Sequence, residues 1–367
     1  MDGRSVRKGK RMNQRFGMGA RLALRSQYGL RVAVIPERYG AVMSPCASIR
    51  LHSFTERFAA DVRYLMPEEL AAFAPHLVLW NRGAVVAEAE LALIAEAGRQ
   101  GASLVYDLDD NLLAMDEHPE REAYAVVIDA VRVSIAMADV TWCSTRRLAD
   151  VVKDAGGTAQ WMPNALDADL WLAAPQTPMP LPDKGVVRLL YMGTRTHDDD
   201  FLLLDAALRQ AWDERPDTFS LTLVGVTAAA TDSRPWMAGL SPPPHVGASY
   251  PAFVHWFSRL RGFHAGVAPL LDTGFNRCKS SIKVLDYAAM GLATFASNVP
   301  AYADDAQEDR ILVDNTHDAW AEKIVALIDR RLAVDEVAAR AISRVGPHMF
   351  DEAVTRRWQS CMQVLGE

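Results

Sequence analysis

The stretch Phe275-Asn-Arg-Cys-Lys-Ser-Ser-Ile-Lys-Val-Leu-Asp-Tyr-Ala-Ala-Met-Gly291 carries the strongest structural signal in this sequence. It follows an apolar run at 265–270, which predicts a strand, and its second half predicts a helix over 281–290 that ends at Gly291. Small polar residues at the start of such a helix expose backbone N–H groups that bind anions. The segment therefore predicts a phosphate site, and an ordinary capped helix with surface lysines is the alternative.

The candidate phosphate ligands lie at the start of this helix. Lys279, Ser280 and Ser281 open it, and Lys283 lies on its first turn. Asp286 follows Lys283 by three residues, so the two side chains share one helix face. A carboxylate at this place can accept hydrogen bonds from ribose hydroxyl groups. A surface ion pair with Lys283 is the alternative for Asp286.

The same alternation of short apolar runs and helical segments extends outward on both sides. In the second half it predicts strands at 187–192, 219–224, 293–297 and 311–313, and helices at 199–214, 252–261 and 316–331. In the first half it predicts strands at 31–36, 77–80, 103–107 and 140–144, and helices at 84–99, 145–155 and 351–365. Ser144 or Thr145 is expected to cap the helix at 145–155. Strands that alternate with helices of this length indicate βαβ units and parallel sheets.

The two halves are separated by four prolines within 175–182. Proline neither donates a ladder hydrogen bond nor continues a helix, so this run is expected to be a linker. The expected organisation is a basic, flexible leader at 1–30, a Rossmann-like domain at 31–174, the linker at 175–186, a second Rossmann-like domain at 187–348 and a C-terminal helix at 349–367 that returns to the first domain. The fold class is therefore α/β, with two doubly wound parallel sheets.

Composition excludes a wholly disordered, a collagen-like and a coiled-coil chain. Of the 367 residues, 50% are hydrophobic and 23% charged, which is typical of a globular chain. Residues 1–31 carry nine of the 39 lysines and arginines and one of the 46 acids, so the remaining 30 basic and 45 acidic residues do not suit nucleic-acid binding. The basic leader either contacts an anionic membrane or polyanion or remains a solvated tail.

The cysteines and the N-terminal composition bear on the compartment. The four cysteines are far apart and show no zinc-ligand spacing, and the leader lacks the apolar segment of a secretory signal. We therefore expect a cytoplasmic protein without a structural metal, with membrane association at the inner face as an alternative for the leader.

Several motifs together resemble a known family. The block KSSIKVLDYAAMGLATFASNVPAY (279–302) is similar to the signature of the C-terminal domain in GT-B fold glycosyltransferases, in the large retaining group often called family four. RLLYMGTRTHDDDFLLLDAAL (188–208) resembles the glycine loop of that domain, and PLLDTGFNRCKS (269–280) resembles the approach to its donor site. LVYDLDDNL (104–112) and the stretch at 139–171 look like its N-terminal domain.

This resemblance implies roles for individual residues. Gly193, Thr194, Arg195 and His197 should face the donor diphosphate. Asn276, Lys279 to Ser281 and Lys283 should bind the donor, and Asp286 should face the ribose. Lys279, Arg195 and His197 would stabilise the leaving diphosphate. A proton relay and a loop histidine that faces water are the alternatives for His197. The family has a second acid eight residues before Asp286, where this chain has Cys278.

The acceptor side is expected at the strand ends of the first half. The run Asp107-Leu-Asp109-Asp110 follows a strand, and its carboxylates suit an acceptor contact, a divalent metal or a strand-end cap. We favour the acceptor role for Asp109 and Asp110 and expect no metal. Gly40 is expected to permit close approach of the backbone, and Arg50 to hold an anionic ligand or else to lie on the surface. The acids at 198–200 suit the positive end of a helix dipole.

The expected function is transfer of a sugar, with retention, from a nucleotide-diphosphate donor to a glycan or lipid-linked acceptor in surface polysaccharide or glycolipid synthesis. No cofactor is expected besides the nucleotide sugar as co-substrate. Two alternatives remain: a catalytically altered binding protein, which the Cys278 substitution suggests, and a sugar-nucleotide epimerase of the same fold. No GxGxxG motif follows a strand, which disfavours a dinucleotide oxidoreductase.

Overall fold

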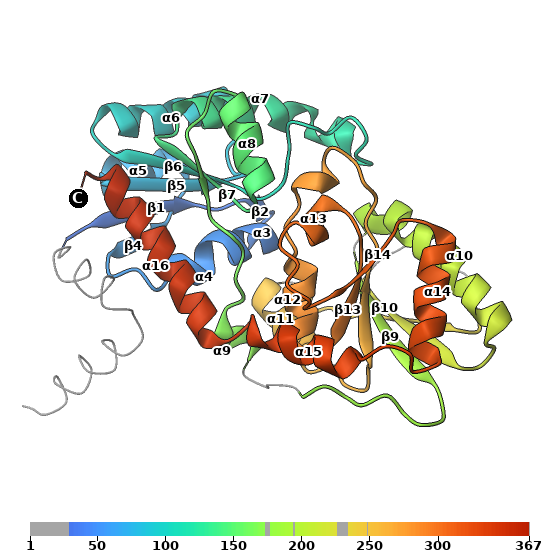
Figure 1. The fold of residues 1–367 in the computed structure, drawn as a ribbon. Coiled ribbons are helices and arrows are strands. Elements are labelled where there is room, and N and C mark those ends of the chain that lie inside the picture. The colour runs from blue at the N-terminus through green and yellow to red at the C-terminus, as the bar shows by residue number, and fades with distance from the viewer. Residues whose placement is uncertain (1–28, 173–176, 194, 226–233, 248, 367) are drawn as a thin grey trace, which may run out of the picture. The chain divides into compact units, whose positions relative to one another are not determined.

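The computed structural model describes residues 29–172, 177–193, 195–225, 234–247 and 249–366, without the side chain of Arg195 (Figure 1). Most of the expected leader and Thr194 therefore lie outside the described residues. The chain divides into two compact units. The first contains 29–116, 121–165 and 347–366, and the second contains 117–120 and 166–346. No described helix combines the length and apolar character that crossing a membrane requires.

The first unit is built on a six-stranded parallel sheet with the order β4-β1-β5-β6-β7-β8. Its strands are β1 (Arg31–Ile35), β4 (Asp61–Tyr64), β5 (Leu77–Asn81), β6 (Ser103–Leu108), β7 (Val140–Cys143) and β8 (Ala159–Trp161), with a small antiparallel pair of β2 (Arg38–Tyr39) and β3 (Val42–Met43). The chain leaves β1 for the edge strand β4 and returns to β5 on the other side of β1. The topological switch point therefore lies between β1 and β5.

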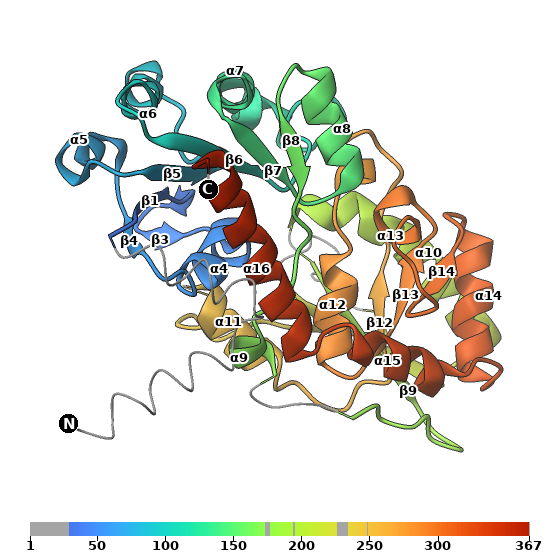
Figure 2. The ribbon, with the colours of Figure 1, turned by 60° about the vertical axis from the view of Figure 1, so that its left-hand side comes forward.

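Helices cover both faces of this sheet. They are α3 (Pro45–Ala47), a π-helical turn (Ser48–His52), α4 (Ser53–Thr55), a 3-10 turn (Pro67–Glu69), α5 (Leu70–Phe73), α6 (Glu88–Arg99), α7 (Arg121–Met137), α8 (Arg146–Asp154) and α16 (Pro347–Val364). Trp80 of β5 donates its indole N–H to Ser134 of α7 at 3.0 Å, whereas Trp142 of β7 donates to Ser360 of α16 at 2.8 Å. Figure 2 shows α7 and α16 on these opposite faces.

The second unit contains another six-stranded parallel sheet, with the order β11-β10-β9-β12-β13-β14. Its strands are β9 (Val187–Met192), β10 (Phe219–Val224), β11 (Met237–Leu240), β12 (Ala265–Ala268), β13 (Ala293–Ser297) and β14 (Ile311–Val313). In order of appearance this is 3-2-1-4-5-6, the order of dinucleotide-binding Rossmann sheets. The switch point lies between β9 and β12.

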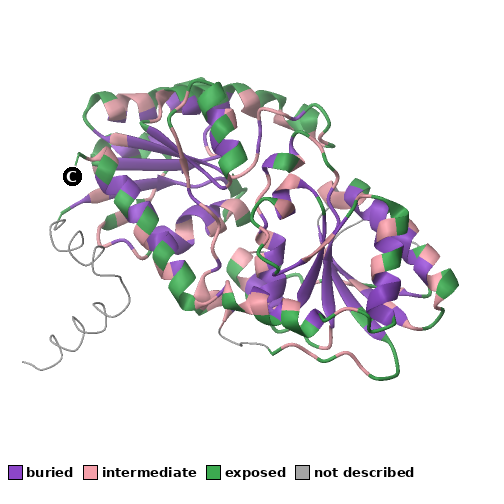
Figure 3. Ribbon diagram, viewed as in Figure 1, coloured by how far each residue is buried: buried purple, intermediate pink, exposed green. Residues whose placement is uncertain are grey.

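Two consecutive residues of β9 pack against different helices. The helices of this unit are α9 (Ala168–Trp171), a 3-10 turn (Arg195–His197), α10 (Asp198–Glu214), α11 (Tyr250–Phe257), a 3-10 turn (Asn276–Cys278), α12 (Ile282–Ala289), α13 (Pro300–Ala303), α14 (His317–Ile328) and α15 (Val334–Ser343). Leu189 belongs to the core with α10 and α14, and Leu190 to the core with α11 and α12. Figure 3 shows the central strands of both sheets as buried, whereas edge strands such as β4 and β11 are partly exposed. The α/β class with two doubly wound parallel sheets is therefore confirmed.

The boundary between the units differs from the expected linker at 175–186. The units change between Ala165 and Leu166, because Leu166 and Trp171 are buried in the core of the second unit. Residues 173–176 lie outside the described residues. At Pro182 the chain is already attached to the second unit, since the Arg330 guanidinium donates to its carbonyl oxygen at 2.6 Å.

Several helix ends also differ from the expected ones. The helix expected over 84–99 begins at Glu88, and the helix expected over 252–261 is α11, which begins at Tyr250 after the Ser249 cap. The hydroxyl of Thr145, and not that of Ser144, accepts the capping N–H from Leu148 at 3.1 Å. The expected end of α12 is confirmed, because Gly291 has a φ of 77°.

Candidate functional site

A pocket lies at the switch point of the second sheet, where the loops after β9 and β12 diverge. It is lined by Glu117, His118, Pro119, Thr196, His197, Asp199, Asp200, Leu271, Thr273, Phe275, Asn276 and Lys279. All of these residues belong to the second unit. Ligands of doubly wound sheets bind at this place, beyond the carboxyl ends of the strands.

Glycines allow the strand ends on one side of this site to come close together. The Gly193 N–H, directly after β9, donates to the Val224 carbonyl oxygen at 3.0 Å. Gly225 follows β10 with a φ of 108°, and a Cβ atom there would collide with the carbonyl oxygen of Gly193. A side chain at this position would therefore have to separate the two loops.

His197 lies on the pocket wall with its imidazole held by a carboxylate. Its Nδ1 is 2.7 Å from Oδ2 of Asp200, and the His197 side chain is 15% exposed. Burial lowers the pKa of His197 to about 4, Lys283 acts in the same direction, and the hydrogen bond to Asp200 opposes both. The imidazole is therefore neutral near pH 7. The expectation of a loop histidine that faces water is wrong, because the ring is mostly buried.

Aromatic rings form another part of the wall. The ring centroid of Phe275 lies 4.6 Å from that of His118 and 4.7 Å from Nζ of Lys279. The amide of Asn276 donates to the Leu271 carbonyl oxygen at 3.0 Å and so braces the loop after β12. Lys279 is thus held at the pocket by a cation–π contact on a fixed loop.

Two buried ionisable groups follow on α12. Lys283 and Asp286 are 8% and 6% exposed, and neither Nζ of Lys283 nor Oδ1 of Asp286 has a hydrogen-bond partner among the described residues. Burial lowers the pKa of Lys283 to about 8 and raises the pKa of Asp286 to about 8. The alternative of a surface ion pair is therefore wrong, because both side chains are inside the unit. Unpartnered buried polar atoms of this kind are costly and need an explanation.

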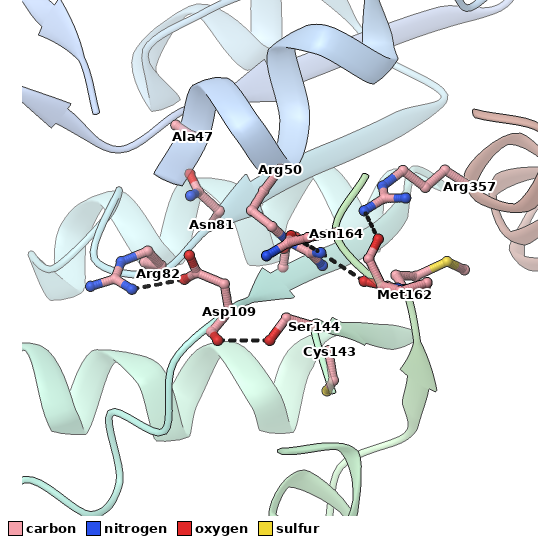
Figure 4. A network of polar contacts seen from close by, with 12 residues as sticks. Ala47, Arg50, Asn81, Arg82, Asp109, Cys143, Ser144, Met162, Asn164 and Arg357 are labelled. Carbon is pink, nitrogen blue, oxygen red and sulfur yellow. Dashed lines mark hydrogen bonds and ion pairs between the residues drawn. The ribbon is translucent and has the colours of Figure 1, made fainter. Parts of the chain in front are cut away.

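The first unit has a second polar cluster at its own switch point. Arg82, directly after β5, donates to Asp109 at 2.7 Å (Figure 4). It also donates to Asp110 at 2.6 Å and contacts Glu37 at 3.3 Å. Cys46 lies close enough to Asp109 and Asp110 for a metal ion to join the three. Both carboxylates are already paired with the Arg82 guanidinium.

Arg50 and Arg357 are both buried beside this cluster. The Arg50 guanidinium binds both oxygens of Asp107, at 2.8 and 3.0 Å, and donates to the Met162 carbonyl oxygen at 2.7 Å. Arg357 of α16 donates to the Pro163 carbonyl oxygen at 3.0 Å and lies 3.6 Å from the ring centroid of Phe54. Burial lowers the pKa of Arg357 well below its usual value. These two arginines join α16 and the helical segment at 45–55 to the sheet.

Comparison with solved structures identifies the fold. HepE from Anabaena, crystallised with UDP and glucose, matches with a TM-score of 0.59 and 12% identity over 90% of this chain and 100% of its own. A glycosyltransferase from Rickettsia africae matches with a TM-score of 0.58 and 11% identity over 92% of this chain and 98% of its own. TarM matches with a TM-score of 0.57 and 8% identity over 82% of this chain. The fold is that of GT-B glycosyltransferases.

The likeness is structural. No protein-family model matches the chain, and neither does any curated protein. The chain spans 58% of the length of TarM but the full length of HepE. A putative UDP-N-acetylglucosamine 2-epimerase from Listeria monocytogenes also matches, with a TM-score of 0.52 and 14% identity over 89% of this chain and 94% of its own.

The structure brings together part of the expected donor site. Of the residues expected there, His197, Asn276 and Lys279 line the pocket. Gly193 directly follows β9, the strand at the switch point. The Ser281 hydroxyl, in contrast, donates to Asp305 at 2.7 Å, so this side chain is already engaged. Thr194 and the side chain of Arg195 lie outside the described residues.

One acceptor-side expectation, that for Arg50, needs correction. Gly40 forms the turn between β2 and β3 with a φ of 63°, which requires a glycine-like backbone, and no described atom lies within 4 Å of where its Cβ would be. Arg50 is fully buried on Asp107 and neither lies on the surface nor holds a ligand there. Asp109 and Asp110 lie together, as their sequence proximity indicates, but both are paired with Arg82.

Sequence reasoning missed residues that only the fold brings to these sites. Arg82 and Glu37 gave no local signal, because their partners are 27 to 45 positions away. The run of acids at 198–200 indicates only a helix start, so it assigns Asp200 no contact with His197. A signal was present, because a spacing of three at a helix start places His197 and Asp200 on one face.

Proposed function

We propose that this chain is a glycosyltransferase that transfers a sugar from a nucleotide-diphosphate donor to a glycan or lipid-linked acceptor, with retention and without a bound metal. The observation that supports it best is the pocket at the switch point between β9 and β12, with Lys279 on its wall. Surface polysaccharide or glycolipid synthesis in the cytoplasm is the setting we propose.

The negative charge of the leaving group indicates which residues are important for catalysis. Sugar transfer releases a nucleoside diphosphate, and fixed positive groups that stabilise this charge supply a large share of catalysis. Lys279 is a cation at the pocket, and the N–H groups at the start of α12 follow it in the chain. We assign the diphosphate to this side of the pocket.

Two buried groups on α12, the helix that follows Lys279 in the chain, also favour a nucleotide ligand on this side of the second unit. Nζ of Lys283 and Oδ1 of Asp286 have no hydrogen-bond partner within the described part of the chain, which costs stability. We assign the ribose hydroxyls to Asp286, and an electrostatic contribution to diphosphate binding to Lys283. UDP is the first nucleotide to test, because HepE was crystallised with UDP and with UDP-glucose.

A thermal-shift panel with UDP, GDP, ADP, CMP and dTDP, each with and without EDTA, tests the donor site. A nucleotide at 100 times its Kd stabilises the chain by about 2.7 kcal/mol, which corresponds to a few degrees. We expect one diphosphate to raise Tm selectively, with no effect of EDTA. Lys279→Ala should abolish the shift, and Lys184→Ala, at an exposed position of the same unit, should preserve it.

The outcomes separate the alternatives. No shift with any nucleotide would favour the altered binding protein suggested by Cys278. If UDP binds, UDP-N-acetylglucosamine alone is incubated with the protein and followed by ¹H NMR, because an epimerase would change the sugar without an acceptor. The anomeric coupling of a transferred sugar then decides between retention and inversion.

Cosedimentation with anionic vesicles, with and without residues 1–30, tests membrane contact through the basic leader.

A further inference from the structure

The carboxylate of Asp200 connects the two loops that form the pocket. Its Oδ2 lies 2.7 Å from Nδ1 of His197, in the loop after β9. Its Oδ1 accepts the backbone N–H of Leu271, in the loop after β12, also at 2.7 Å. The Asp200 side chain is 6% exposed, so water competes little for either hydrogen bond.

These two contacts determine which nitrogen of His197 carries the proton. An ionised carboxylate can only accept hydrogen bonds, so Nδ1 must be the donor to Oδ2. Because a neutral imidazole has one protonated nitrogen, Nε2 then carries a lone pair. The bond from Leu271 holds the other carboxylate oxygen and so keeps the carboxylate plane from rotating away from the ring.

The charge state of the ring limits what Nε2 can bind. Burial, together with Lys283, lowers the pKa of His197 to about 4, so the ring stays neutral despite the adjacent carboxylate. Phosphate oxygens are acceptors and would meet the Nε2 lone pair without a proton between them. A sugar hydroxyl can donate to that lone pair.

We propose that Asp200 is a positioning residue that presents Nε2 of His197 as a hydrogen-bond acceptor for a hydroxyl of the donor sugar, while the diphosphate lies toward Lys279. This inference rests on the proposed function and assigns the sugar end of the same pocket. It also changes the role expected for His197, from stabilising the diphosphate to recognising the sugar.

Asp200→Asn is a selective test because it changes the proton pattern and little else. The amide oxygen can still accept the Leu271 N–H, so the loop contact is kept. The amide nitrogen then faces Nδ1 as a donor, which forces the proton of His197 onto Nε2. The pocket would gain a donor where it had an acceptor. The same reversal of tautomer is what an Asp-to-Asn change produces in a serine protease triad.

The tautomer is measured directly by ¹⁵N NMR of the full chain labelled at histidine, with His197→Gln to assign the signals. We expect a protonated, pyrrole-like Nδ1 in the unsubstituted protein at pH 7 and a pyridine-like Nδ1 in D200N. Asp213→Asn, at an exposed position on the same helix, should leave both signals unchanged. A pyridine-like Nδ1 in the unsubstituted protein, or unchanged signals in D200N, would overturn the positioning role.

Binding separates sugar recognition from nucleotide recognition. Calorimetry with UDP and with UDP-glucose gives the gain in affinity that the sugar supplies. We expect D200N to bind UDP with the same affinity as the unsubstituted protein. Its affinity for UDP-glucose relative to UDP should fall about tenfold, which corresponds to one hydrogen bond. An equal loss for both ligands would mean a merely structural role and overturn the proposal. Absence of nucleotide binding in the unsubstituted protein would overturn the proposed function and the sugar contact, whereas the NMR result would still decide the positioning role.

Discussion

Asp286 and Lys283 are two ionisable residues whose charged forms are disfavoured by burial. Both side chains are inside the second unit, and each has a polar atom without a partner among the described residues. Burial disfavours the charged form of each, which brings both pKa values to about 8. Groups held in this way often belong to functional sites, because a ligand supplies the missing partners.

Asp286→Asn should make the unliganded protein less sensitive to pH. The folded-state pKa of Asp286 is raised from 3.8 to about 8, so its favourable contribution is fully present below pH 3.8 and is lost as the pH rises toward 8. Asparagine does not ionise. Between pH 5 and pH 8, the free energy of unfolding of D286N should rise by about 2–4 kcal/mol relative to that of the unsubstituted protein. Urea unfolding at both pH values measures this gain.

Two features make the test specific. Asp213→Asn, at an exposed position on α10, should show no such pH-dependent gain. D286N should also bind the nucleotide more weakly if the carboxylate contacts the ribose. Equal stability differences at pH 5 and pH 8 would show that Asp286 does not titrate in this range.

Arg50 and Arg357 should respond in opposite ways to replacement by methionine. Arg50→Met leaves Asp107 buried without its cation, and burial already raises the pKa of that carboxyl. We expect a loss of about 3–5 kcal/mol. Arg357 has no carboxylate partner among the described residues and stacks on Phe54, so Arg357→Met should cost less than about 1 kcal/mol. Urea unfolding of both variants checks the contrast, and equal losses would contradict it.

At the scale of elements, β9, β12 and α12 are joined by one buried side chain. The Tyr287 hydroxyl on α12 accepts the Met192 N–H at 2.9 Å and donates to the Val267 carbonyl oxygen at 3.2 Å. Its ring packs over Gly266 so closely that a Cβ there would lie 2.5 Å from ring atoms. The two strands at the switch point and the helix beside them therefore form one rigid support for the pocket.

Gly266→Ala should disrupt this support. The Tyr287 ring is fully buried and cannot move aside, so we expect a loss of about 2–4 kcal/mol and weaker nucleotide binding. Gly239→Ala on the edge strand β11 is the matched control, because its Cβ would meet nothing within 4 Å. Thermal unfolding with and without UDP measures both effects. A neutral G266A variant would show that α12 shifts freely on the sheet.

Most elements were predictable because local patterns specify them. Buried parallel strands are continuous apolar runs, and the predicted strands at 187–192, 219–224, 293–297 and 311–313 match β9, β10, β13 and β14. Weak patterns were missed, such as β4, in which Asp61 and Arg63 are exposed, and β8, which has only three residues. Their pairing with neighbouring strands, and not their own composition, makes them strands.

At the scale of the whole molecule, the C-terminal helix belongs to the unit formed by the start of the chain. Trp358 of α16 is buried with residues of β1, β5 and β7, and Ser103 of β6 donates its hydroxyl to the Val364 carbonyl oxygen at 3.0 Å. The first unit is therefore incomplete until the last residues are present.

Trp358→Ala should destabilise the first unit selectively. Truncation of a buried tryptophan costs about 3–5 kcal/mol, and all its core neighbours belong to this unit. Hydrogen exchange read by mass spectrometry should show faster exchange in peptides from β1, β5 and β7. Peptides from β9 and β12 should be unchanged. Equal acceleration in both units would mean that they unfold as one cooperative body.

The sequence determined the class of the fold, and it placed Lys279 before the helix that carries Lys283 and Asp286. Lys283 and Asp286 lie three positions apart on α12, so the period of a helix is enough to relate them, and Lys279 lies just before that helix. Tertiary structure alone decided the rest. Arg50 is buried, and Arg82 lies among Glu37, Asp109 and Asp110. The boundary between the units lies after Ala165, and the Leu271 N–H binds the Asp200 carboxylate that orients His197. The reason is physical: these contacts depend on strand order, which brings distant loops to one sheet edge, and no short-range pattern encodes that order.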